Sequence, residues 1–134
     1  MHMMAPIPSH LDALTETIIG AAFTVANDLG HGFLEAVYRN ALIEELTFQG
    51  LSVAKEKSYP VFYRQKQVGH YCADIVVENT VIIELKAVET LSPAHRAQLL
   101  NYLKASTLPI GLLLNFGTSK IQMKRVLNMI TSRP

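Results

Sequence analysis

Three charged side chains stand in two otherwise apolar stretches between Tyr71 and Lys86. Asp74 interrupts the first stretch, and Glu84 and Lys86 interrupt the second. Both stretches are rich in β-branched residues, and Asn79 supplies turn chemistry between them, so the sequence predicts a β-hairpin. Burying unpaired charge in such a strand pair costs several kcal/mol, so we expect the cluster to have a function or a compensating partner.

The length of the hairpin loop decides whether Asp74 joins Glu84 and Lys86 on one face. Side chains alternate along a strand, which places Glu84 and Lys86 together and Leu85 on the opposite face. A two-residue loop would set Asp74 opposite Ile83 or Leu85, whereas a three-residue loop sets it opposite Glu84. We expect the three-residue loop, because Asn tolerates the left-handed backbone conformation that such loops require.

Two carboxylates on adjacent strands could hold a divalent cation. Mg²⁺ takes oxygen ligands and often uses one or two carboxylates, with water and substrate phosphate completing its shell. Asp74, Glu84 and the backbone carbonyl of Leu85 could supply these oxygens. Lys86 could stabilise a pentavalent phosphate or help to deprotonate the attacking water. The alternative is a structural salt-bridge cluster. Spacing alone does not separate the two, since Asp followed ten residues later by Glu-x-Lys matches many sequences by chance.

The elements that would position this cluster follow from the periodicity of apolar residues. Two helices are predicted by recurrence every three or four residues, with Gly30 ending the first and Gly50 the second. Alternation then predicts strands, and Pro60 indicates an edge or a bend in the first of them. Ser92 and Pro93 have the types preferred at a helix start. The expected order is a helix over 11–29, a helix over 34–49, a three-strand meander over 51–87 with a polar turn at 64–67, a helix over 92–105, a buried strand over 108–115 and a final strand over 121–127.

This order predicts an α/β fold with a mixed sheet flanked by helices. We expect a flexible N-terminal arm over residues 1–10 and a single domain over 11–130. The last element is ambiguous, because its apolar residues also suit a helix as far as Ile130. We expect the strand.

Composition excludes several classes of protein. One cysteine, Cys72, rules out an intramolecular disulfide framework and a multi-cysteine zinc site. A run of apolar residues long enough to span a membrane does not occur, and we expect a cytoplasmic protein. The net charge of +1 conceals an asymmetry: residues 1–50 hold six acidic residues and one basic residue, and residues 51–134 hold five acidic and eleven basic residues. The second part could face a polyanion, although solvated Lys and Arg explain it equally well.

The arrangement of Asp74, Glu84-Leu85-Lys86 and a later helix bearing Gln98 resembles the PD-(D/E)XK nuclease superfamily. Within it, the stretch from Gly32 to Tyr38 is similar to the motif that names the GxxExxY protein family. Further similar stretches are Ile83-Glu84-Leu85-Lys86-Ala87-Val88, Gln98-Leu99-Leu100-Asn101-Tyr102-Leu103 and Gly111-Leu112-Leu113-Leu114-Asn115-Phe116-Gly117. The similarity covers residues 11–128 in the right order.

The resemblance implies a restriction-endonuclease-like sheet with an αβββαβ core and an extra N-terminal helix. It implies Mg²⁺ or Mn²⁺ held by Asp74, Glu84 and the Leu85 carbonyl, with Lys86 as the catalytic lysine. Gln98 would orient water or substrate. On spacing alone, Glu35 is explained by the helix dipole, but the resemblance implies that it joins the metal shell. The superfamily pattern has a proline before Asp74, and Ala73 stands there instead.

These features favour a metal-dependent phosphodiester hydrolase that acts on DNA or RNA. A homodimer or a protein partner could help to hold the substrate, because a separate nucleic-acid-reading module is not evident. The alternative is a non-catalytic module that keeps the nuclease fold to bind nucleic acid or protein. An enzyme using Cys72 as nucleophile is a third hypothesis, but a lone cysteine in a strand is more often part of a core.

Overall fold

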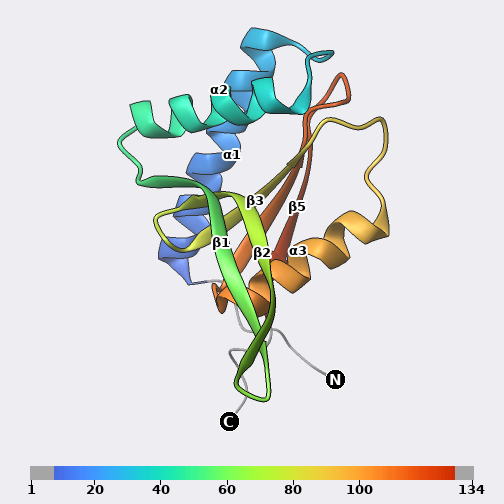
Figure 1. The fold of residues 1–134 in the computed structure, drawn as a ribbon. Coiled ribbons are helices and arrows are strands. Elements are labelled where there is room, and N and C mark those ends of the chain that lie inside the picture. Colours follow the sequence, from blue (N-terminus) through green and yellow to red (C-terminus); the bar gives the residue numbers. More distant parts are fainter. Residues whose placement is uncertain (1–7, 129–134) are drawn as a thin grey trace, which may run out of the picture.

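A five-stranded mixed sheet forms the centre of the protein, with helices on both of its faces (Figure 1). The computed structural model describes residues 8–128. The elements in chain order are α1 (Ser9–Leu29), α2 (Glu35–Phe48), β1 (Val53–Tyr63), β2 (Lys66–Val77), β3 (Val81–Lys86), α3 (Pro93–Ser106), β4 (Ile110–Asn115) and β5 (Gln122–Leu127).

The strands follow one another across the sheet in chain order. β3 and β4 run parallel, and the other neighbouring pairs are antiparallel. Parallel neighbours need a crossover connection, and α3 supplies it between β3 and β4. This topology confirms the predicted α/β fold, with its mixed sheet, flanking helices and additional N-terminal helix.

Two apolar clusters bury the two faces of the sheet. α1 packs along one face and α3 along the other, and in Figure 1 they lie on opposite sides of the central strands. β4 is buried along its whole length, which explains its wholly apolar sequence. The first cluster includes Ile18, Val25, Tyr38, Leu42, Ile75, Ile83, Leu85, Leu112 and Phe116, and the second includes Val76, Ile82, Leu99, Tyr102, Leu103, Leu113 and Val126.

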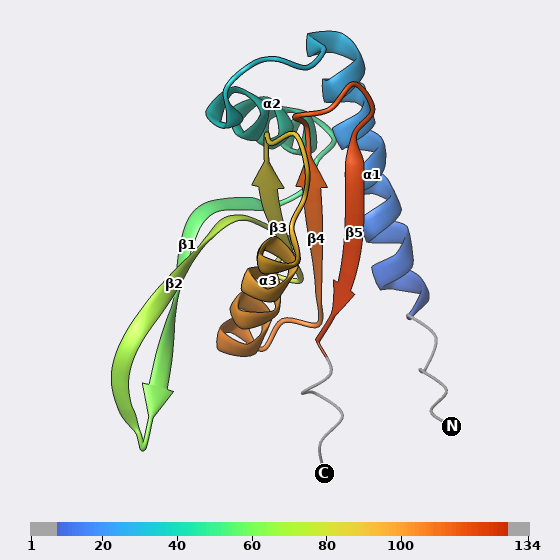
Figure 2. The ribbon, with the colours of Figure 1, turned by 90° about the vertical axis from the view of Figure 1, so that its right-hand side faces the viewer.

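α2 lies across the end of the sheet toward which β3 and β4 point (Figure 2). Its buried stripe of Tyr38, Leu42 and Leu46 contacts the same cluster as α1. The first turn of α2 is therefore close to the end of β3, where the sequence places Glu84 and Lys86.

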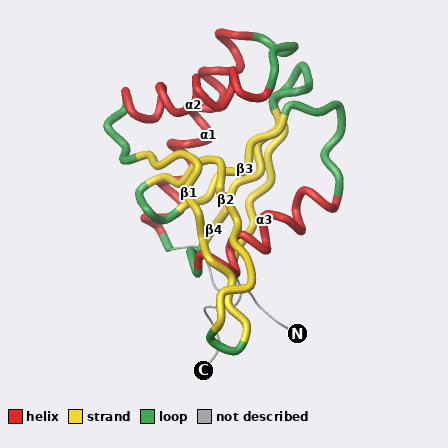
Figure 3. Tube along the Cα trace, in the orientation of Figure 1, coloured by secondary structure: helices red, strands yellow, loops and turns green. Residues whose placement is uncertain are grey.

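The β1–β2 hairpin extends well beyond the rest of the sheet (Figures 1 and 3). β2 pairs with β3 at Ile75, Val76 and Val77, so the remainder of the hairpin is a two-stranded ribbon. We call residues 57–73 the arm. β1 is an edge strand and passes through Pro60 with a register shift between Val61 and Phe62, as the proline predicts.

Several predicted boundaries move by a few residues. α1 begins at Ser9, so the last two residues of the predicted N-terminal arm are helical, and residues 1–7 lie outside the described range. β2 begins at Lys66 rather than Val68, because Lys66 and Gln67 pair with β1. The final element is a strand paired with β4, as expected.

Within residues 8–128, no helix has the length and apolar character needed to cross a membrane.

Candidate functional site

The β2–β3 turn brings the two predicted carboxylates to the same level of the sheet. Val77 pairs with Val81, which leaves a three-residue loop and confirms that prediction. Glu78 and Asn79 both have positive φ, at 53° and 49°. Continuing the pairing past Ile75 and Ile83 by one residue sets Asp74 opposite Glu84.

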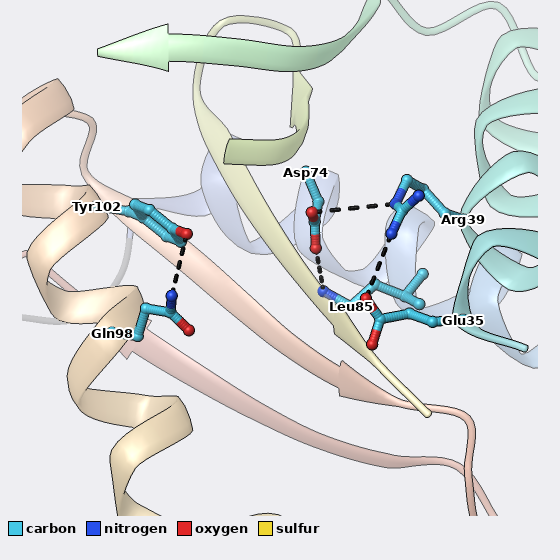
Figure 4. Close-up of polar contacts among 6 residues, drawn as sticks. All are labelled: Glu35, Arg39, Asp74, Leu85, Gln98 and Tyr102. Carbon is cyan, nitrogen blue, oxygen red and sulfur yellow. Dashed lines mark hydrogen bonds and ion pairs between the residues drawn. The ribbon is translucent and has the colours of Figure 1, made fainter. Parts of the chain in front are cut away.

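The Asp74 carboxylate is fixed by the backbone of the neighbouring strand. The Leu85 N–H donates a hydrogen bond of 3.2 Å to Asp74 Oδ2 (Figure 4). The Asp74 side chain is 24% exposed, so it remains open to solvent on one side. Asp74 is therefore held in position yet accessible to a ligand.

Glu84 is the buried member of the pair. It is 2% exposed, and its Oε1 atom has no hydrogen-bond partner within residues 8–128. The pKa of Glu84 is raised to about 8, first by burial and then by the neighbouring carboxyl group of Asp74. Lys86 lowers this pKa, whereas Glu35 raises it. Lys86 and Glu35 therefore both act on the electrostatics of Glu84.

Arg39 connects α2 to this pair, and the sequence did not single it out. Its Nη2 lies 3.3 Å from Glu35 Oε2, and its Nε lies 4.0 Å from Asp74 Oδ1 (Figure 4). Arg39 follows Glu35 by one helical turn, which is the signal that could have found it. In this arrangement the predicted metal ligand Glu35 is paired with a cation from its own helix.

The glycine–glutamate–tyrosine spacing around Glu35 has a structural cause. Tyr38 is fully buried, and its ring stacks on Phe116 with centroids 4.9 Å apart. Its hydroxyl donates to the Gly30 carbonyl at 2.6 Å and accepts from the Phe33 N–H at 3.1 Å. These bonds tie the loop before α2 to the helix, so Tyr38 fixes the first turn that carries Glu35.

α3 contributes a second pair of polar side chains. Gln98 Nε2 donates to the Tyr102 hydroxyl at 3.2 Å, and in Figure 4 this pair lies across from Arg39 and Glu35, with Asp74 between them. The pKa of Tyr102 is raised to about 12 by burial and by the nearby charges, first Glu84 and then Asp74. Tyr102 is therefore part of this site. In the sequence it stands one helical turn after Gln98, inside the family-like stretch from Gln98 to Leu103.

A clamp holds the chain that leaves β3 after Lys86. Asn115 accepts from the Val88 N–H at 3.0 Å and donates to the Val88 carbonyl at 2.9 Å. A Cβ atom at Gly117 would lie 2.3 Å from the Val88 backbone, so this position has no room for a side chain. The conformation after Lys86 is thus set by the end of β4.

His95 and Cys72 lie outside the carboxylate pair. His95 accepts a hydrogen bond of 3.1 Å from the Ser92 N–H through Nδ1, so it caps α3. Cys72 is an exposed free thiol on the arm.

The carboxylates suit a metal that takes few protein ligands. Among residues 8–128 there is no cluster of three or more His, Cys, Asp and Glu side chains placed to hold a metal ion. Asp74 and Glu84 form a pair, however, and the buried Oε1 of Glu84 is an oxygen without a partner in the described chain. Mg²⁺ usually binds through one or two carboxylates and keeps several waters, so this pair fits it.

A family model described as the PD-(D/E)XK nuclease superfamily matches residues 12–126. Since this range spans most of the chain, the protein belongs to that superfamily. Nucleases of this superfamily generally use divalent metal ions and act on nucleic acid. No curated protein matches the chain in sequence.

The crystal structure of SSO0001 has a similar fold. It aligns with a TM-score of 0.56 and 17% identity, covering 69% of this chain and 49% of SSO0001. The aligned part is thus about half of SSO0001, and at this identity the likeness bears on the fold alone.

Proposed function

We propose that this protein is a divalent-metal-dependent phosphodiester hydrolase that cuts DNA or RNA. The observation that carries the proposal is the Asp74–Glu84 pair at the end of the sheet, with the unpartnered Oε1 of Glu84. A carboxylate pair with one buried member is destabilising unless a proton or a cation compensates it. Its occurrence in a member of a nuclease superfamily favours a metal site.

Each predicted residue has a role in this proposal. Asp74, Glu84 and the Leu85 carbonyl would hold Mg²⁺ or Mn²⁺. Residues 8–128 do not hold a third acidic ligand beside this pair, so Glu35 would join the metal shell only after leaving its ion pair with Arg39. A bound cation of this kind lowers the pKa of its water and stabilises negative charge on phosphate. Lys86, on the same face as Glu84, would stabilise the developing charge of the phosphate or help to deprotonate the attacking water.

Gln98 would orient the attacking water or the substrate. Its amide already donates to Tyr102, so the side chain is held on the side of α3 that faces the carboxylates. Within the superfamily, we propose that the chain is a GxxExxY protein, because Gly32, Glu35 and Tyr38 have that spacing and Tyr38 positions the helix carrying Glu35.

Thermal unfolding of the wild type and Asp74→Asn, each in EDTA and in millimolar Mn²⁺, tests the metal site. Ligand binding to the folded state raises Tm, so Mn²⁺ should stabilise the wild type and leave the variant unchanged. In EDTA, Asp74→Asn should be as stable as the wild type or more so, because it removes repulsion between carboxylates. Cleavage of labelled DNA and RNA in Mn²⁺ should require Asp74.

A non-catalytic binding module is the second candidate, and the Arg39–Asp74 ion pair is the observation that favours it. In that case the polar cluster is structural. Asp74→Asn would then destabilise the protein, and Mn²⁺ would change neither protein's Tm. This outcome would contradict the hydrolase proposal.

A further inference from the structure

A cavity of about 350 Å³ lies between the arm and α3. Phe62 and Tyr71 line it from the arm, and Asn101 and Lys104 line it from α3. Phe62 is 60% exposed despite its size, and Lys104 is exposed as well. The cavity thus combines aromatic surface, an amide and a cation.

This cavity adjoins the candidate active site through two aromatic rings. Tyr71 packs edge-on against Tyr102, with centroids 5.0 Å apart, and Tyr102 accepts the hydrogen bond from Gln98. Lys104 follows Gln98 by six residues on the same helix, a rise of about 9 Å along the axis. An extended strand at the active site could reach the cavity over this short distance.

Charge distinguishes this cavity from another on the far side of the sheet. The second cavity, of about 500 Å³ between α1 and α2, is lined by Asp28, Glu44 and Glu45 beside the exposed Phe48. A polyanion would be repelled there. The cavity beside α3 instead carries the positive charge of Lys104, which attracts a phosphate group.

We propose that the cavity between the arm and α3 binds an unpaired nucleotide of the strand being cut. This inference rests on the proposed function and specifies its substrate as single-stranded DNA or RNA, or a single-stranded flank. Aromatic side chains bind unpaired bases by stacking, and a lysine binds the adjoining phosphate. The bases of an intact duplex are stacked on each other and offer no free face to Phe62.

Fluorescence anisotropy of the full chain in EDTA tests the proposal without cleavage. The probes are labelled oligothymidine, oligouridine and a blunt DNA duplex of equal length, which also separate DNA from RNA. Single strands should bind more tightly than the duplex, and Phe62→Ala should weaken that binding about five-fold or more. Lys104→Ala should weaken it and reduce the salt slope by about 0.7, the value for one phosphate contact.

Phe48→Ala and Lys124→Ala are matched controls. Phe48 is an exposed phenylalanine beside the acidic cavity, and Lys124 is an exposed lysine on the opposite edge strand. Both control variants should bind as the wild type does. All four side chains are largely exposed, so the substitutions leave the core intact.

Equal binding of duplex and single strands, or wild-type binding by Phe62→Ala and Lys104→Ala, would overturn the proposal. Cleavage by the wild type in Mn²⁺ tests the hydrolase function separately from the cavity. If the wild type cleaves but Phe62→Ala and Lys104→Ala bind as it does, only the proposal of nucleotide binding in the cavity is overturned. Selective single-strand binding without cleavage supports the cavity and overturns the hydrolase.

Discussion

The Arg39 guanidinium lies 4.0 Å from the Asp74 carboxylate, Nε to Oδ1, and also pairs with Glu35. One cation from α2 therefore contacts two carboxylates that come from different elements of the fold. A metal ion held by Asp74 would compete with this guanidinium for the same negative charge. The Arg39 guanidinium thus lies beside the carboxylate that we propose as a metal ligand.

Arg39→Gln should make the protein respond more strongly to Mn²⁺. In EDTA its stability should fall by no more than about 1 kcal/mol, because partly exposed ion pairs contribute little. The rise in Tm on adding Mn²⁺ should exceed that of the wild type, since the competitor is gone. Arg125→Gln is the control, because it breaks a partly exposed arginine–aspartate pair away from the site, with Asp12. Equal Mn²⁺ responses in the two variants would show that Arg39 does not compete for the metal.

The pKa of Glu84 predicts a pH-dependent stability. Its value rises from 4.5 to about 8 on folding, so between these pH values the folded state holds a proton that the unfolded state has lost. Stability from this group is therefore present below pH 4.5 and is lost as the pH rises toward 8, by at most about 1.4 kcal/mol per pH unit. Urea unfolding in EDTA from pH 5 to 8 measures this slope.

Glu84→Gln should flatten that slope, because the amide does not titrate. Glu89→Gln, at an exposed position beyond β3, should leave the slope unchanged. A slope that survives in Glu84→Gln would assign the proton to another group.

Tyr38→Phe should loosen the start of α2. The substitution keeps the stacked ring but removes the hydroxyl that joins the Gly30 carbonyl and the Phe33 N–H. Loss of these bonds should cost about 1–3 kcal/mol, measured by urea unfolding. Cleavage should fall as well, because Glu35 loses its fixed position. Tyr63→Phe, at a ring 65% exposed, should change neither quantity.

Gly117→Ala should be strongly destabilising. The added methyl would lie 2.3 Å from the Val88 backbone, which cannot rotate away, and such overpacking costs about 1–3 kcal/mol or more. Gly20→Ala provides the opposite control. Apart from the adjoining residues and the backbone of α1 itself, nothing in the described structure lies within 4 Å of a Cβ at Gly20. Alanine should therefore stabilise α1 by up to about 1 kcal/mol. Similar melting temperatures for the two variants would contradict the clamp at Val88.

The β2–β3 hairpin could be predicted from the sequence because its determinants are local. Alternation places Glu84 and Lys86 on one face, and the conformational tolerance of Asn79 favours the three-residue loop that the structure confirms. The wholly apolar sequence of β4 likewise reports its position inside the sheet. The fold class follows from the order of such local signals.

Arg39 and Tyr102 could not be predicted because their roles depend on packing between distant elements. An arginine four residues after a glutamate is normally a solvated helix pair, and only the position of α2 over the sheet brings Arg39 to Asp74. Tyr102 fits the buried stripe of α3 as a core residue, and its closeness to Glu84 appears only when α3 crosses the sheet. The projection of the arm past the other strands depends on which residues of β2 pair with β3, and alternation within a strand does not determine that pairing.

The arm and the central strands should differ greatly in how easily their backbone opens. Between 57 and 73, β1 and β2 have each other as partners, whereas β3 and β4 have a strand on both sides. Amide hydrogens of the arm should therefore exchange through local opening at a low free energy, while those of β3 and β4 exchange near the global limit. Glu84 lies on the rigid part and Phe62 on the compliant part. The part of the arm that carries Phe62 can therefore adjust to different bases while Asp74 and Glu84 keep their positions.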